Sequence, residues 1–117
     1  MKITLISPYP DITSFGIRTI SSYLKQHHFE TQLIFLPDPF GDNFVVCEKR
    51  YDENTLDEVA NICSKSDLIG VTLMTNFFDG AVQITQNLKK HLSTPILWGG
   101  IHPTVRPEEC LKFADMV

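Results

Sequence analysis

The chain has 117 residues, of which 43% are hydrophobic and 21% charged, so its size and composition suit one globular domain with a single core. Its formal net charge of -4 provides no basic surface, which excludes a nucleic-acid backbone or an anionic membrane as the main partner. No apolar run approaches the roughly 20 residues of a membrane helix, and no signal-peptide pattern opens the sequence, so we expect a cytoplasmic protein.

The first third of the chain alternates between short apolar runs and a segment of helical period. Residues 2–7 and 30–36 are predicted as strands, and residues 15–27 as the helix between them. The buried face of this helix is expected to carry Ile17, Ile20 and Leu24. A β-α-β unit therefore opens the predicted fold.

A second helix is predicted over residues 55–65, where Thr55 and Glu58 fit a capping box. Its apolar stripe is expected to contain Leu56, Val59, Ala60 and Cys63. The next strand, residues 67–74, is almost entirely apolar, which is typical of a strand covered on both faces.

The remaining elements continue the alternation to the end of the chain. A helix over residues 77–92 is expected to bury Ala81, Ile84, Leu88 and Leu92. A strand at 94–100, a short helix opened by Pro107 with Glu108 and Glu109 in its first turn, and the start of a fifth strand at 114–117 follow. The order predicts an α/β fold whose parallel sheet has helices on both faces.

The connection over residues 37–53 is longer than the usual 2 to 6 residues of such loops. It contains four apolar residues outside the predicted core, namely Phe40, Phe44, Val45 and Val46. Two interpretations stay open, a segment folded back on the sheet edge and a contact surface for a partner. Because the sequence ends within the predicted fifth strand, we expect residues 1–117 to be the N-terminal domain of a longer polypeptide.

The three cysteines give no sign of a metal or iron–sulfur centre in this chain. Cys47, Cys63 and Cys110 are far apart and form no CxxC or CxxxC group. We expect free thiols and no metal-ligating residues.

Small or polar residues follow three of the predicted strands, in the segments SPYPDITSFGIR, TLMTNFF and GGIHPT. The carboxyl ends of parallel strands meet at one edge of a sheet, where ligands bind in open α/β folds. Each segment also has a purely structural interpretation. Asp11, Thr13 and Ser14 suit a helix cap, Thr72 suits the core, and His102 suits an exposed loop.

Together these segments resemble the cobalamin-binding domain, especially the version at the N-terminus of B12-binding radical SAM proteins. The family pattern is Asp-x-His-x-x-Gly, then Ser-x-Leu, then Gly-Gly. This chain has Asp11-x-Thr13-x-x-Gly16, then Thr72-x-Met74, then Gly99-Gly100, and its GGIHPT followed by PEE is typical of the radical SAM branch. The resemblance implies a flavodoxin-like (Rossmann-type) three-layer sandwich with about five strands in the order 2-1-3-4-5.

The same resemblance implies cobalamin as the ligand of residues 1–117 and assigns no catalytic residue to them. The implied contacts are Tyr9, Asp11, Thr13, Ser14, Gly16, Thr72, Met74, Thr75, Asn76, Gly99, Gly100, His102, Pro103 and Thr104. Thr13 replaces the histidine that ligates cobalt in the mutases, and a neutral hydroxyl is a poor ligand for that metal. Bound cobalamin is therefore expected to be base-off, without a histidine below it.

The radical SAM branch implies a partner domain in the same polypeptide. That domain would hold a [4Fe-4S] cluster and S-adenosylmethionine, because this chain lacks the CxxxCxxC run that binds such a cluster. The whole protein is expected to be a methyltransferase or a related enzyme, whereas this chain alone is expected to be non-catalytic.

Other functions stay open from the residues alone. One is the N-terminal half of a nucleotide-sugar glycosyltransferase, although this leaves GGIHPTVRPEE unexplained. Others are a flavin-binding domain and a receiver domain, but a receiver needs acidic residues where Ser7 and Pro8 stand. The last is a degenerate docking domain that binds no cofactor.

Overall fold

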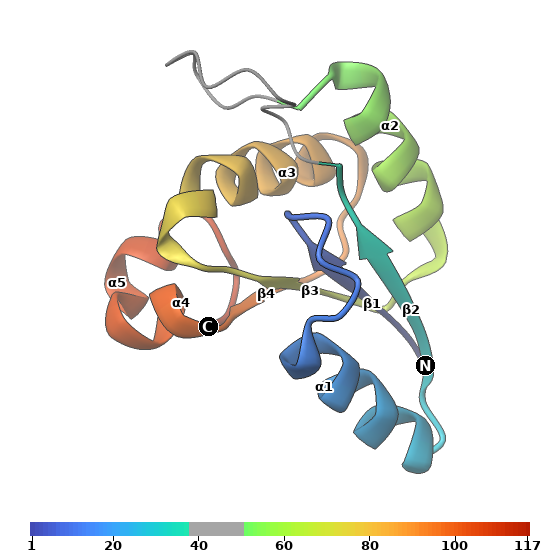
Figure 1. Cartoon of the computed structure of the whole chain (residues 1–117). Helices are drawn as coiled ribbons and strands as arrows, with labels where there is room; N and C mark the ends of the chain where they lie inside the picture. Colours follow the sequence, from blue (N-terminus) through green and yellow to red (C-terminus); the bar gives the residue numbers. More distant parts are fainter. Residues whose placement is uncertain (38–50) are drawn as a thin grey trace.

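The computed structural model describes residues 1–37 and 51–117, which form a parallel sheet with helices on both faces (Figure 1). The strands are β1 (Lys2–Ser7), β2 (Glu30–Phe35), β3 (Leu68–Thr72) and β4 (Ile96–Gly99). They lie in the order β2-β1-β3-β4, and every neighbouring pair is parallel. This is the predicted flavodoxin-like arrangement.

The helices follow the predicted alternation with shifted ends. The longer ones are α1 (Phe15–Gln26), α2 (Glu53–Ile62) and α3 (Phe78–His91), and two short ones, α4 (Ile101–Val105) and α5 (Pro107–Cys110), follow β4. Single 3-10 turns, η1 (Cys63–Lys65) and η2 (Thr75–Phe77), lie after α2 and before α3. Figure 1 shows α2 and α3 on one face of the sheet and α1 on the other.

The main core lies between the sheet and the α2–α3 layer. Leu56, Val59, Ala60 and Cys63 are buried on the α2 side, and Ala81, Ile84 and Leu88 on α3, as expected from helical period. Leu92, predicted in the same stripe, follows the end of α3 and is only partly buried. The same core contains Ile69 and Val71 of β3, Leu73 directly after β3, and Ile96 and Trp98 of β4. Alternation along a strand therefore turns Gly70, Thr72, Leu97 and Gly99 toward the opposite face.

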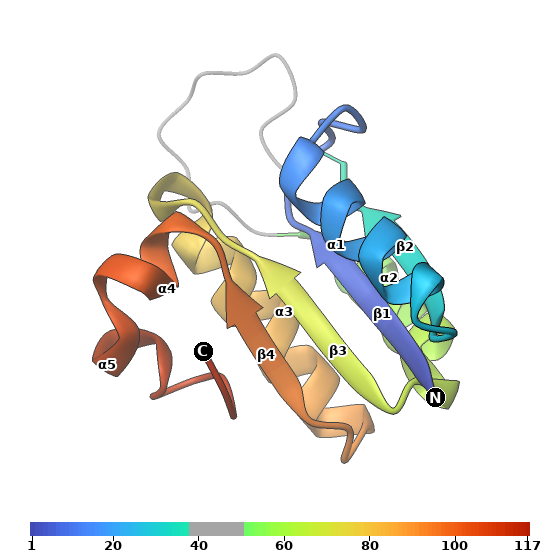
Figure 2. The same cartoon turned by 90° about the horizontal axis from the view of Figure 1, so that it is seen from below.

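The α1 face of the sheet has a smaller core made by Ile3, Leu5 and Ile17. Ser21 is buried one turn after Ile17 and shares a 3.0 Å hydrogen bond with Thr31 of β2, whereas Ile20 is exposed. The prediction that Ile20 is buried was wrong, because α1 contacts the sheet through a narrow stripe that passes through Ser21. Seen from below in Figure 2, α1 covers β1 and β2, whereas none of the helices in residues 1–37 and 51–117 covers this face of β3 and β4.

A fifth strand is only begun in the described residues. Met116 forms an isolated parallel bridge with Leu97, in which the Trp98 N–H donates to the Met116 carbonyl at 2.9 Å. The sheet of the described residues thus has four strands, with the predicted fifth position marked beside β4.

Two other local predictions were wrong. α2 begins at Glu53, two residues before Thr55, so the predicted capping box of Thr55 and Glu58 does not form its start. Its N-cap is Asp52, which makes no side-chain cap bond.

Residues 101–105, expected as loop, form α4, whereas α5 begins at Pro107 as predicted. The apolar residues of the 37–53 connection, from Phe40 to Val46, lie outside the described residues.

Candidate functional site

The three polar segments singled out from the sequence lie at the carboxyl edge of the sheet, after β1, β3 and β4 (Figures 1 and 2). They cover residues 7–18, 72–78 and 99–104, and each begins at the last residue of a strand and continues into the helix or 3-10 turn that follows. Parallel strands bring these connections to one edge, as predicted.

The segment after β1 is organised by Asp11. One of its carboxylate oxygens, Oδ1, accepts the Thr13 backbone N–H at 2.9 Å and the Thr13 hydroxyl at 2.6 Å. The hydrogen bond from the Thr13 hydroxyl, and then that from the backbone, hold the pKa of the Asp11 carboxyl below its ordinary value. Both side chains are exposed, so this ionised turn faces solvent at the start of α1.

The interpretation of these residues as a helix cap finds no support in their hydrogen bonds. Ser14 occupies the N-cap position of α1, but its side chain makes no cap hydrogen bond. Asp11 bonds to Thr13 within the turn, and Gly16 in the first turn of α1 has open space around it. The turn is thus held by its own local bonds.

The ends of β3 and β4 meet at Thr72 and Gly99, which are register partners. The Leu73 N–H donates to the Gly99 carbonyl at 2.8 Å, which continues the pairing past the end of β3. Since Val71, Leu73 and Trp98 face the α2–α3 core, Thr72 and the open side of Gly99 face the α1 side, where none of the described helices covers β3 and β4.

The paired glycines have different physical roles. A Cβ built on Gly99 meets no atom within 4 Å, so the space above its backbone is open. Gly100 has φ +111°, a conformation that L side chains rarely adopt, and a Cβ there would lie 2.8 Å from the Leu73 carbonyl oxygen. Gly100 is therefore required by the fold, whereas Gly99 leaves room for something outside it.

Side-chain contacts tie the three segments to one another. Tyr9 lies against Phe77, with ring centroids 4.9 Å apart, and thereby joins the segment after β1 to the one after β3. A 3.0 Å hydrogen bond between His102 Nδ1 and Thr75 Oγ1 joins the segments after β3 and β4. The edge is thus one connected surface.

His102 was expected in an exposed loop, and that prediction was wrong. It lies in α4 with 7% of its surface exposed, and its ring is 5.0 Å from that of Phe78 between centroids. Pro103 is also buried, whereas the hydroxyl of the exposed Thr104 donates to the Gly100 carbonyl at 2.7 Å. The GGIHPT segment therefore turns His102 and Pro103 inward and leaves Thr104 outside.

The predicted contact residues fall into two groups by exposure. Those at the solvent-facing edge are Asp11, Thr13, Gly16, Met74, Thr75, Asn76, Gly100 and Thr104. Tyr9, Ser14, Thr72 and Gly99 are half-buried, and His102 and Pro103 are buried. All fourteen lie in the segments at the carboxyl edge or in the elements that border it; their roles as ligand contacts stay predictions.

One supporting residue was missed from the sequence. Tyr51 is buried, and its hydroxyl donates to the Pro8 carbonyl at the end of β1. Its backbone exchanges two hydrogen bonds with the Gln83 side chain of α3, at 2.7 and 3.0 Å. Only the aromatic type of Tyr51, placed just before a helix, could have suggested a buried anchor.

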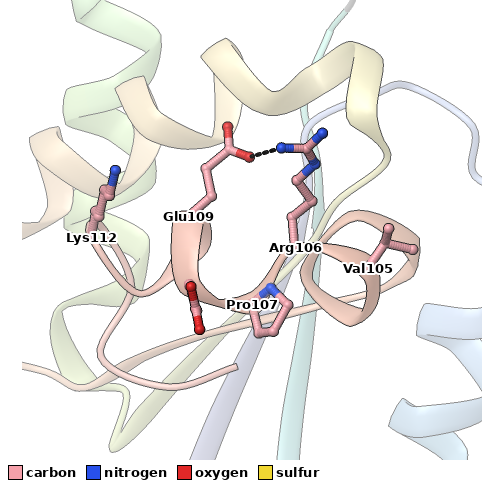
Figure 3. Close-up of a pocket in the computed structure, with 6 residues that line it drawn as sticks. Val105, Arg106, Pro107, Glu109 and Lys112 are labelled. Atoms are coloured by element: carbon pink, nitrogen blue, oxygen red, sulfur yellow. Dashed lines mark ion pairs between the residues drawn. The ribbon is translucent and has the colours of Figure 1, made fainter.

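A separate surface hollow of about 730 Å³ lies on the α4–α5 segment (Figure 3). It is lined by Val105, Arg106, Pro107, Glu108, Glu109 and Lys112. Arg106 Nη1 and Glu109 Oε2 form an ion pair 3.9 Å long, drawn as a dashed line. The lining charges thus partly neutralise one another, and an exposed pair of this kind contributes little to binding or stability.

Two further features bear on the chemistry of the described residues. In residues 1–37 and 51–117 no group of three or more His, Cys, Asp or Glu side chains is placed to hold a metal ion. Among the same residues, no helix has the length and apolar character required to cross a membrane.

Comparison with known proteins assigns the chain to a family. No curated protein sequence matches it at a significant level. The family model described as B12 binding domain matches residues 1–117, the whole chain. The fold, with its strand order and its three polar segments at one edge, agrees with that assignment, and the chain belongs to the B12 binding domain family.

Proposed function

We propose that this domain holds cobalamin across the carboxyl edge of its sheet and serves as the accessory domain of a radical SAM enzyme. The observation that carries the proposal is the open backbone at Gly99 beside Thr72, on a sheet face that the helices of the described residues leave uncovered at β3 and β4, in a chain of the B12 binding domain family. When bound, cobalamin supplies a cobalt-carried methyl group.

The residues at this edge fit a large ligand with an extended polar tail. Gly99 allows close approach to its backbone, and the Thr72 hydroxyl lies opposite it in the strand pairing. We propose that Thr72 and Gly99 would line the nucleotide tail, whereas Gly100 sets the path of the chain behind them. The exposed Met74, two residues after the end of β3 at Thr72, is a further proposed contact of cobalamin.

The turn after β1 supports a base-off mode of binding without a histidine ligand. The Thr13 hydroxyl is neutral and already donates to Asp11, so it offers cobalt neither an imidazole nitrogen nor an anion. Asp11 orients Thr13 through hydrogen bonds, just as a carboxylate orients a metal-ligating histidine in other proteins. If cobalt lay above this turn, the Thr13 side chain would face it with a neutral hydroxyl held by Asp11.

The GGIHPT and PEE segments support a radical SAM partner domain in the same polypeptide, with methyl transfer as the reaction class. The described thiols are unsuited to a cluster, because Cys63 and Cys110 are buried and burial raises the pKa of Cys63 to about 11. We propose that the [4Fe-4S] cluster and S-adenosylmethionine are bound by that partner domain, in the cytoplasm, and that residues 1–117 carry no catalytic group.

A titration of the purified chain with hydroxocobalamin, followed by gel filtration, tests the proposal. We expect the cobalamin absorbance to co-elute with the protein. Gly99→Leu places a side chain in the open space and should weaken binding on the order of ten-fold or more, with an unchanged melting temperature. Ser22→Leu adds the same side chain at an exposed position of α1 and should bind normally.

A colourless protein fraction, for this chain and for any longer polypeptide that contains it, would overturn the proposal in favour of a degenerate docking domain. If the Gly99→Leu variant binds hydroxocobalamin as tightly as the unaltered chain, the ligand does not bind at the β3–β4 edge. A yellow fraction with flavin, in place of cobalamin, would replace the ligand altogether.

A further inference from the structure

The side chain of His102, in the short helix α4, contacts residues of three other elements. Its Nδ1 is 3.0 Å from Thr75 Oγ1, and its ring packs on Phe78 at the start of α3. Its Nε2 is 3.7 Å from Glu109 Oε2 in α5, and the side chain is only 8% exposed. One imidazole ring thus touches residues from η2, α3 and α5.

Only one of its two ring nitrogens has a hydrogen bond in the described part of the chain. The buried Nε2 has no hydrogen-bond partner there, and its 3.7 Å separation from Glu109 is too long for a hydrogen bond. A buried nitrogen without a partner costs free energy, so packing alone would favour an apolar residue at position 102. What the imidazole adds is the directional bond to Thr75.

Thr75 lies in the 3-10 turn between β3 and α3, at the edge where the cofactor is proposed to bind. Thr75 itself is exposed to solvent. The turn is also held by the Phe77 N–H, which donates to the Met74 carbonyl at 2.9 Å. Two hydrogen bonds from His102, which follows β4, reach this region. Its side chain bonds to Thr75, and its backbone N–H donates to the Leu73 carbonyl at 3.3 Å.

We propose that His102 is a positioning residue of the cofactor edge. Its Nδ1 fixes Thr75 and thereby holds the 73–77 segment in its binding conformation before the ligand arrives. The expected effect on the affinity for cobalamin rests on the proposed function, but the hydrogen bond between His102 and Thr75 is present without ligand. Ordering a loop in advance raises affinity because the ligand no longer has to order it.

A matched pair of variants separates the hydrogen bond from the packing. Asn and Leu have nearly the same shape, and both remove the imidazole ring and its Nε2. His102→Asn keeps an amide at the position of Nδ1, whereas His102→Leu keeps none. Thr75→Val removes the hydroxyl from the other side with little change of shape.

Isothermal titration with hydroxocobalamin should show about five-fold weaker binding for His102→Leu and for Thr75→Val, as expected for one hydrogen bond of ordinary strength. His102→Asn should bind close to the unaltered chain. The double variant His102→Leu/Thr75→Val should be no weaker than either single one, because both remove the same bond. Additive losses, or equal losses for Asn and Leu, would overturn the proposal.

Hydrogen–deuterium exchange of the ligand-free chain gives a second readout that needs no cobalamin. The amides of residues 73–78 should exchange about five-fold faster in His102→Leu and Thr75→Val, and near the original rate in His102→Asn. Unchanged exchange in all variants would overturn the positioning role. If the unaltered chain binds no hydroxocobalamin while exchange follows this pattern, the proposed function fails and the positioning role stands.

Discussion

The hydroxyl of Thr13 donates a 2.6 Å hydrogen bond to Oδ1 of Asp11, the same oxygen that accepts the Thr13 backbone N–H. A carboxylate that orients the residue two positions later is the arrangement that would serve a metal-ligating imidazole, with a threonine in its place. The turn therefore has the carboxylate of such an arrangement but no imidazole.

Placing an imidazole at position 13 is the sharpest test of this turn. Thr13→His places an imidazole next to Asp11, and the ultraviolet-visible spectrum of bound hydroxocobalamin should shift to a histidine-ligated form. Thr13→Val should leave the spectrum of the bound cofactor unchanged, because the hydroxyl is not a ligand. The absence of a shift in Thr13→His would mean that this position does not lie below the metal.

Gly100 is expected to be sensitive to the smallest substitution. Gly100→Ala must place a Cβ at φ +111° and 2.8 Å from the Leu73 carbonyl oxygen, so the free energy of unfolding should fall by about 1–3 kcal/mol or more. Gly99→Ala, one residue earlier, should change it by about 1 kcal/mol or less, because its Cβ meets open space. Urea denaturation followed by the fluorescence of the single tryptophan, Trp98, measures both. Equal losses would contradict the division of roles between the two glycines.

The arrangement of the sheet was predictable because its signals are local. Strands such as residues 68–72 are short apolar runs, and α3 repeats its apolar residues with helical period, so both are readable from one segment at a time. The order of elements then places every strand end at one edge. That the three polar segments share this edge follows from the same reasoning and needs no knowledge of side-chain contacts.

The supporting contacts of the edge were not predictable because they depend on distant elements. His102 is a polar residue between a glycine pair and a proline, and its burial depends on Phe78 and Thr75. Tyr51 reaches the Pro8 carbonyl from 43 positions away in sequence. The start of α4 likewise depends on the Leu73 carbonyl, which accepts the His102 N–H. No local pattern contains these partners.

Acid should weaken the attachment of the last residues through Asp115. Its carboxylate accepts the Ile96 N–H at 2.9 Å and the Lys89 ammonium at 3.0 Å, and these bonds, the backbone one first, lower the pKa of Asp115. A lowered folded-state pKa means that the stabilisation is complete above the unfolded pKa of about 3.9 and is lost as the pH falls below it. The Asp11 carboxyl, whose pKa is also lowered, acts in the same direction.

The variant Asp115→Asn isolates this contribution. It should cost about 1 kcal/mol or less at pH 7, because the side chain is 44% exposed, and it should flatten the dependence of unfolding on pH below about 4. Lys89→Met, which leaves the Ile96 bond intact, should flatten it less. Urea midpoints measured between pH 7 and pH 2 compare the three chains, and a steeper acid dependence in Asp115→Asn would reverse the assigned sign.

Removing a single hydroxyl at position 51 should loosen the segment after β1. Tyr51→Phe keeps the ring that lies 3.1 Å from the Cβ position of Gly80 but leaves the buried Pro8 carbonyl without the bond from the Tyr51 hydroxyl. The expected loss is about 1–3 kcal/mol of unfolding free energy, the usual cost of a buried acceptor without a partner. Because Pro8 leads directly into Tyr9 and the Asp11 turn, the affinity for hydroxocobalamin should also fall, by a few-fold.

Tyr23→Phe makes the same chemical change on the exposed side of α1, where 62% of Tyr23 is accessible, and should alter neither the stability nor the affinity. If Tyr51→Phe loses stability but binds hydroxocobalamin with full affinity, Tyr51 supports the core alone and the Pro8 turn does not shape the cofactor edge.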